Sequence, residues 1–197
     1  MKTSVVIAED DPLTRMDIVE ILTEAGYDVI GEASDGIEAI TVCQEKNPDI
    51  VLLDIKMPMI TGLQASKILT DENFEGCIVL LTAYNIEEYI NTASKNKVMG
   101  YLLKPIEEKT FLSHLKLVFN NYKNFKSLKK EVKEIKETLD NRKIIERAKG
   151  IIMNSKKISE NEAYKILREI SMTKRLSILS LSKIILMTGD FDDNCLL

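Results

Sequence analysis

The chain has 197 residues, enough for one large domain or two smaller ones. Hydrophobic residues make up 45% and charged residues 29%, which is typical of a folded globular protein rather than a disordered one. No apolar run approaches the roughly 20 residues that span a bilayer, no signal peptide is recognisable, and the three cysteines lack metal-ligand spacing. These features exclude a membrane protein and favour a cytoplasmic protein with reduced thiols.

The charge is distributed unevenly along the sequence. Residues 1–115 carry 9 Lys and Arg against 20 Asp and Glu, a net charge of −11, whereas residues 116–197 carry 18 against 11, a net charge of +7. This asymmetry is typical of an acidic domain joined to one that binds a polyanion. A basic helix face that is merely solvated would give the same pattern.

Residues 1–121 alternate between short apolar runs and segments with helical spacing. Gly26 and the Asn47-Pro48 pair follow two of the helical segments and are typical helix ends. The alternation predicts an α/β domain whose five-stranded parallel sheet is covered on both faces. The predicted strands are 5–8, 27–33, 49–54, 77–82 and 100–103, and the predicted helices are 12–25, 36–46, 62–70, 87–96 and 107–121.

After residue 121 no strand pattern and no proline occur. A heptad repeat over residues 122–141 predicts a coiled-coil helix continuous with the first domain, in which Glu131 at g and Lys136 at e suit a parallel dimer. The alternative is a helix that packs against its own domain. The a positions are Val118, Phe125, Val132 and Leu139, and the d positions are Leu128 and Ile135, with the polar Asn121 and Arg142 at the ends.

The remaining sequence predicts a three-helix all-α domain over residues 142–189. The long helix is expected to run to about residue 154, and Ser159 with Glu162 forms a capping-box pattern that opens a second helix, to about residue 170. A third helix is predicted over 178–187, ending near Gly189. Residues 190–197 are predicted to be a flexible tail.

Charged residues gather where the predicted strands end. Glu9 and Asp10 follow the first strand, Asp54 ends the third and Lys104 follows the fifth. Because carboxyl ends of parallel strands share one edge of the sheet, these side chains should lie together. Crowded carboxylates require a cation, and their hard oxygens suit Mg²⁺. A single aspartate at a strand end, such as Asp11 beside this group, is more often a helix cap.

The spacing of these residues, with Thr82 at the end of the fourth strand, resembles the receiver domain of bacterial two-component response regulators over residues 1–121. The resemblance implies that a sensor histidine kinase phosphorylates Asp54, that Lys104 and Thr82 contact the phosphoryl group, and that Tyr101 is a switch residue. Tyr101 could instead be a half-buried strand aromatic. The implied Mg²⁺ ligands are Glu9, where aspartate is frequent, Asp10, Asp54 and the backbone carbonyl of Lys56.

A second motif lies in the basic C-terminal part. Ala148-Lys149-Gly150-Ile151-Ile152-Met153, followed by Ala163-Tyr164 and Leu167-Arg168, resembles the ANTAR domain, an RNA-binding module of transcription antitermination regulators, over about residues 137–188. Ser182, where the family commonly has alanine, and Ile178-Leu179 depart from its pattern. The resemblance leaves the third helix least defined.

The composition of this segment suits RNA. It contains 11 Lys and Arg against 4 Glu between Arg142 and Lys183, and such cations provide affinity for phosphates. Tyr164 and Arg168 lie one helical turn apart and could stack unpaired bases. Ala148 and Gly150 would permit close backbone approach, with Lys149 beside them. Tyr164 could instead be a core aromatic, and Met153 and Met172 are expected in the core.

These patterns together predict a response regulator that acts as an antiterminator. Phosphorylation would promote homodimerisation through the coiled coil, and the dimer would bind hairpin loops of a nascent leader RNA so that the terminator cannot form. One alternative is a DNA-binding response regulator that acts as a transcription factor, and another is an interaction or phosphorelay protein. An independent metabolic enzyme is disfavoured, because the acidic edge is the only chemical site in the pattern.

Overall fold

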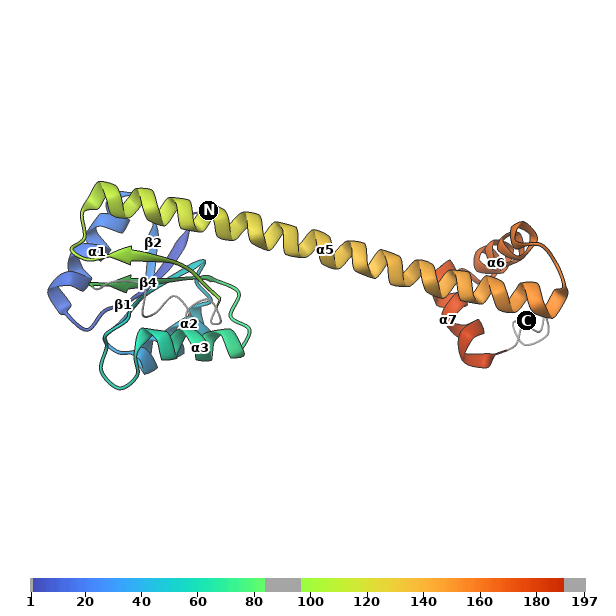
Figure 1. Ribbon diagram of the computed structural model, residues 1–197, viewed down its shortest axis with the longest axis horizontal. Coiled ribbons are helices and arrows are strands. Elements are labelled where there is room, and N and C mark those ends of the chain that lie inside the picture. The colour runs from blue at the N-terminus through green and yellow to red at the C-terminus, as the bar shows by residue number, and fades with distance from the viewer. Residues whose placement is uncertain (1, 84–96, 190–197) are drawn as a thin grey trace. The chain divides into compact units, whose positions relative to one another are not determined.

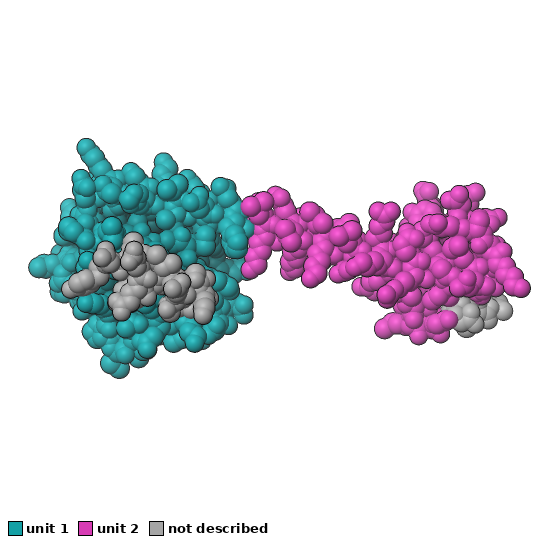
Figure 2. Space-filling view, in the orientation of Figure 1, with its two compact units in different colours: residues 1–126 teal, residues 127–197 magenta. Residues whose placement is uncertain are grey.

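The computed structural model describes residues 2–83 and 97–189. The chain divides into two compact units, residues 1–126 and residues 127–197 (Figure 2). The predicted helix 87–96 and the predicted tail 190–197 lie outside the described residues. Within the described ranges, no helix combines the length and the apolar character needed to cross a membrane.

A five-stranded sheet forms the centre of the first unit (Figure 1). Every pairing is parallel and the strand order is β2-β1-β3-β4-β5, so the predicted α/β fold is confirmed. β3 and β4 are buried along their whole length, as continuous apolar runs in a covered parallel sheet should be. The strands are β1 (Ser4–Ala8), β2 (Asp28–Ala33), β3 (Ile50–Asp54), β4 (Cys77–Thr82) and β5 (Val98–Leu103).

Helices cover both faces of this sheet because side chains alternate along each strand. Val6 and Val51 point into a core with α2 and α3, whereas Ile7 and Leu52 point into a second core with α1 and α5. Side chains of Asp11, Asp35 and Thr61 accept backbone N–H groups and begin α1, α2 and α3, respectively. The helices are α1 (Pro12–Glu24), α2 (Gly36–Lys46), α3 (Gly62–Asp71) and α5 (Glu108–Lys156).

The topology brings two acidic segments together. β1 pairs with β3 in a register that sets Ala8 beside Leu53, so the residues after β1 adjoin Asp54 at the end of β3. The chain places β2 on one side of β1 and all later strands on the other, and a ligand crevice is expected where the order reverses. This geometry fixes the position of the candidate site.

Helix α5 has 49 residues and continues from the first unit into the second. Its first turns are buried through Phe111 and Leu115. The Tyr122 hydroxyl then donates to the backbone carbonyl of Glu75, and Lys126 Nζ lies 3.3 Å from Glu75 Oε2. These contacts attach α5 to the loop before β4, and the apolar heptad positions follow beyond them.

The second unit contains the last turns of α5, α6 (Glu160–Lys174) and α7 (Ile178–Thr188). The predicted capping box is present, with Ser159 accepting from the Glu162 backbone and Glu162 accepting from the Ser159 backbone. α6 runs four residues beyond the predicted end because no glycine or proline interrupts it, and it stops at Arg175 in the left-handed region. The core consists of Ala148, Ile152, Ala163, Leu167, Leu181 and Ile185.

Ser182, which departs from the family pattern, is buried beside this core. Its hydroxyl donates to the carbonyl of Ile178 at 2.7 Å, one turn earlier in α7. Because this hydrogen bond satisfies the buried hydroxyl, and because serine is only slightly larger than alanine, Ser182 can occupy the position without leaving an unpaired polar group.

Candidate functional site

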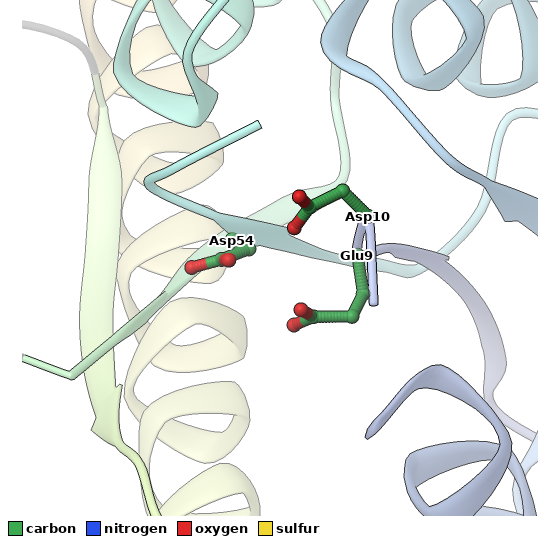
Figure 3. Close-up of side chains that lie close together, drawn as sticks. All are labelled: Glu9, Asp10 and Asp54. Carbon is green, nitrogen blue, oxygen red and sulfur yellow. The ribbon is translucent and has the colours of Figure 1, made fainter. Parts of the chain in front are cut away.

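Three carboxylates converge at the carboxyl edge of the sheet (Figure 3). Each of Glu9, Asp10 and Asp54 has an oxygen within 4.8 Å of the others. Glu9 is 1% exposed and Asp54 is 7% exposed, whereas Asp10 is open to solvent. The site thus has two buried carboxylates and one that faces water.

Lys104 provides the positive charge at this site. Its Nζ lies 2.5 Å from Glu9 Oε2 and 3.0 Å from Asp54 Oδ2. Its backbone N–H donates to the Thr82 carbonyl at 2.8 Å, which aligns the end of β5 with the end of β4. Burial alone would lower the pKa of Lys104, but hydrogen bonds to Glu9 and Asp54 raise it above its ordinary value, so the group is an ammonium.

The charges at this site are not balanced without a further cation. Burial raises the pKa of Glu9, and the charge of Asp54 raises it further, while the hydrogen bond from Lys104 opposes both. Counted at their formal charges, the three carboxylates and the one ammonium sum to −2, which one divalent cation balances. Oxygen-only donors, one of them exposed, fit Mg²⁺, which keeps part of its water shell.

Close backbone contacts support the acidic residues. A Cβ at Gly62 would lie 2.2 Å from the backbone oxygen of Asp54, so only glycine allows α3 to begin this close to the strand end. Arg15 Nη1 donates to the Glu9 carbonyl at 2.6 Å, and its Nε lies 3.3 Å from Glu32 Oε2. Arg15 was not among the predicted site residues, since its only signal in the sequence is a position one turn after the α1 cap.

The remaining predicted receiver residues lie on β4, on β5 and just after β3. Thr82 is buried at the end of β4, and Lys56 is exposed just after β3. Tyr101 on β5 packs partly against the α2 and α3 core, and burial raises its pKa. Asp11 is the α1 cap, as expected, and the Thr14 hydroxyl and backbone N–H hold its pKa below the ordinary value.

The second unit presents a mixed aromatic and charged surface. Tyr164 is 43% exposed, so its interpretation as a core aromatic is wrong, and Arg168 is exposed one turn later. Met172 is also exposed, so the expectation that it lies in the core is wrong too, whereas Met153 packs against the core as expected. Met172 lies nine residues, or two and a half turns, after the buried Ala163 and is therefore on the opposite side of α6 from the core.

The Ala148-Lys149-Gly150 motif divides between core and surface. Ala148 is fully buried, so its methyl group serves packing rather than direct contact with RNA. Lys149 is 7% exposed, and its Nζ lies 2.8 Å from Glu146 Oε2 and 2.7 Å from Glu160 Oε1. A Cβ at Gly150 would meet nothing within 4 Å. Of the three, only Gly150 offers the open approach that the sequence pattern predicted.

Comparisons with known proteins agree with both halves of this description. The model of the response regulator receiver domain matches residues 5–116, and that of the ANTAR domain matches residues 133–186. The transcriptional regulatory protein PdtaR of Mycobacterium tuberculosis is 33% identical over 184 residues, covering 93% of this chain and 89% of that protein. The chain belongs to the ANTAR response regulators.

Other similar proteins match a smaller share of this ANTAR response regulator. The nitrate/nitrite response regulator protein NarL of Escherichia coli is 34% identical over 57% of this chain and 52% of its own length. The receiver domain structure of the putative response regulator NarL of Mycobacterium tuberculosis has a TM-score of 0.57 at 27% identity, covering 60% of this chain and 97% of that one. The chemotaxis protein CheY4 of Vibrio cholerae gives 0.56 at 28%, covering 60% and 99%.

Proposed function

We propose that this chain is a phosphorylation-controlled RNA-binding antiterminator. A sensor histidine kinase phosphorylates Asp54, two chains pair through α5, and the paired ANTAR domains bind hairpin loops of a nascent leader RNA. The observation that carries the proposal is α5 itself, one helix that begins in the core of the receiver and ends in the core of the ANTAR domain. A change in the pairing of α5 therefore acts directly on the RNA-binding surface.

The proposed chemistry uses Asp54 as a nucleophile. A carboxylate oxygen attacks the phosphorus of a phosphohistidine, and a P–O bond forms as the P–N bond to the departing imidazole breaks. The Lys104 ammonium, now 3.0 Å from Asp54, would follow the charge onto a phosphoryl oxygen, and the Thr82 hydroxyl would donate to another. Movement of Thr82 would then change the rotamer of Tyr101.

Glu9, Asp10, Asp54 and the Lys56 carbonyl are the proposed Mg²⁺ ligands, since these oxygens and the net charge of the pocket fit such an ion. When bound, Mg²⁺ would neutralise the negative charge that develops on the phosphoryl oxygens.

The heptad positions supply the proposed dimer contact. Phe125, Leu128, Val132, Ile135 and Leu139 are between 54% and 64% exposed. A repeated apolar stripe of this kind is stable in water when a second helix covers it. The polar Asn121 and Arg142 at the ends of the stripe confine the pairing to about three heptads.

The RNA contact is proposed at Tyr164 and Arg168, both exposed on α6. Stacking of a base on an aromatic ring contributes about 1–3 kcal/mol, so Tyr164→Ala should weaken binding to a loop-bearing hairpin roughly tenfold or more. Arg168→Ala should act in the same direction. Thr173→Ala is the matched control, because nine residues of helix place Thr173 on the side of α6 opposite to Tyr164.

The test is binding of the phosphorylated full chain, side by side, to RNA hairpins recovered by selection and to duplex DNA. The proposal requires tighter binding to the hairpins, with Tyr164→Ala and Arg168→Ala reducing it and Thr173→Ala leaving it unchanged. Preference for duplex DNA would instead identify a DNA-binding transcription factor. Binding to neither would identify a regulator that acts through protein contacts.

A further inference from the structure

One charged cluster in the ANTAR domain is unsuited to phosphate. Among the described residues, Lys149 is the one buried lysine, and it is held by a carboxylate from each of two helices, Glu146 on α5 and Glu160 on α6. The three charges sum to −1. A phosphate approaching this point meets excess negative charge, although the segment around it is basic.

The cluster lies beside the exposed aromatic ring of the module. Lys149 Nζ is 6.0 Å from the centre of the Tyr164 ring. Glu160, Tyr164 and Arg168 follow one another at intervals of four residues and therefore share one face of α6. The side chains of Glu146 and Glu160 are 49% and 63% exposed, and an ionised carboxylate that accepts from Lys149 keeps lone pairs for further donors.

Gly150, the residue after Lys149, is a glycine that packing within the chain does not require. It follows Lys149 inside α5, where glycine costs roughly 0.5–1 kcal/mol relative to alanine. A methyl group there would touch nothing within 4 Å, so no contact within the chain requires glycine. Gly150 lies one turn after Glu146 on the same face of the helix, which leaves open space next to the cluster.

We propose that Glu146, Lys149, Glu160 and Tyr164 form a subsite for one unpaired RNA base. The base stacks on Tyr164, its N–H edge donates to the two carboxylates, and the open face at Gly150 admits it. Lys149 is a positioning residue that fixes both carboxylates and contacts no phosphate. The inference rests on the proposed function and adds a specificity: amino-bearing bases over uracil, whose single N–H lies between two carbonyl oxygens that carboxylates repel.

The test compares two variants that remove the same charge from the same helix. The probe is a selected hairpin in four versions, with A, C, G or U at one loop position at a time. Glu169→Gln, on another side of α6, should leave binding unchanged or slightly tighter, because it removes a negative charge. Glu160→Gln should weaken binding about tenfold and reduce discrimination against uracil at one loop position.

Loss of stability cannot imitate this result, since an unfolded fraction lowers affinity for all four RNAs equally and leaves their ratios unchanged. If Glu160→Gln binds as tightly as the parent chain with the same ranking of bases, the inference is overturned while the proposed function stands. If the parent chain binds no hairpin RNA, the proposed function itself fails.

The salt dependence of RNA binding tests whether Lys149 positions the carboxylates or contacts phosphate. For Lys149→Met the ratio between loop bases should fall, as in Glu160→Gln, while the dependence of log affinity on log salt concentration stays the same. A phosphate contact at Lys149 would lower that slope by about 0.7. Such a decrease would overturn the assignment of Lys149 as a positioning residue.

Discussion

Lys104 provides the positive charge that contacts the acidic cluster of Glu9, Asp10 and Asp54. Its ammonium contacts both Glu9, at 2.5 Å, and Asp54, at 3.0 Å, and both carboxylates are buried. Removing one partner of a buried ion pair is costly because the remaining charge stays desolvated, typically by about 3–5 kcal/mol. The same removal makes the pocket more negative and hence more attractive to a divalent cation.

Lys104→Met should therefore lower the melting temperature of the receiver and increase its dependence on Mg²⁺. We expect a loss of about 3 kcal/mol without Mg²⁺ and a larger Mg²⁺-induced rise in melting temperature than in the parent chain. Thermal unfolding across a MgCl₂ titration measures both effects. Lys67→Met, an exposed position on α3, is the control and should change neither. Equal Mg²⁺ responses in Lys104→Met and the parent chain would contradict the proposed ligand set.

At the scale of single elements, the start of α6 is predicted to be sensitive to acid. The Ser159 hydroxyl and backbone N–H hold the pKa of Glu162 below its ordinary value of 4.5, and Lys149 does the same for Glu160. Because the unfolded chain binds these protons more readily, the stability contributed above pH 4.5 is lost as the pH falls through the lower folded pKa values.

The expected result is a decrease in α6 stability on acidification below about pH 4.5, which amide signals of the full chain can follow by NMR during thermal unfolding. Glu162→Gln keeps an acceptor for the Ser159 N–H but does not titrate at this position. In this variant the stability of α6 should depend less on pH than in the parent chain. The same pH dependence in both would show that Glu162 does not contribute to the acid sensitivity.

Helix α5 carries the prediction about assembly. Ile135 is exposed at a d position, so Ile135→Lys should leave the single chain folded but place two charges in the apolar contact of a dimer. A penalty on the order of 3 kcal/mol corresponds to a dissociation constant about 100-fold higher. Glu137→Lys, at the f position away from the contact, is the control. Sedimentation of phosphorylated chains should show dimers for the parent and for Glu137→Lys, but monomers for Ile135→Lys.

The elements differ in how far the sequence determines them. The sheet was predictable because apolar strands alternate with helices that begin at Asp11, Asp35 and Thr61, all local signals. The acidic pocket was predictable because parallel strands bring their carboxyl ends to one edge. The contact of Arg15 with Glu9, the burial of Lys149 and the exposure of Met172 were not, since each depends on which sides of two helices pack together.

At the scale of the whole molecule, one chain contains both a receiver domain and an ANTAR domain. The receiver has an acidic cluster, Glu9, Asp10 and Asp54, with Lys104 in contact with Glu9 and Asp54, and the ANTAR domain exposes Tyr164 and Arg168. Helix α5 has residues in the cores of both. Pairing of α5 would bring two RNA-binding surfaces onto one RNA, and two linked contacts can raise avidity by about 10²–10⁴ over one.

The most direct test of this account is the affinity of the full chain for a selected RNA hairpin pair, measured with and without a small-molecule phosphodonor. For the parent chain we predict an increase of tenfold or more on phosphorylation, the lower part of the range for linked contacts. Asp71→Ala, an exposed position at the end of α3, should respond like the parent, whereas Asp54→Ala should not respond. An Asp54→Ala chain that gains RNA affinity from the phosphodonor as the parent does would contradict the account.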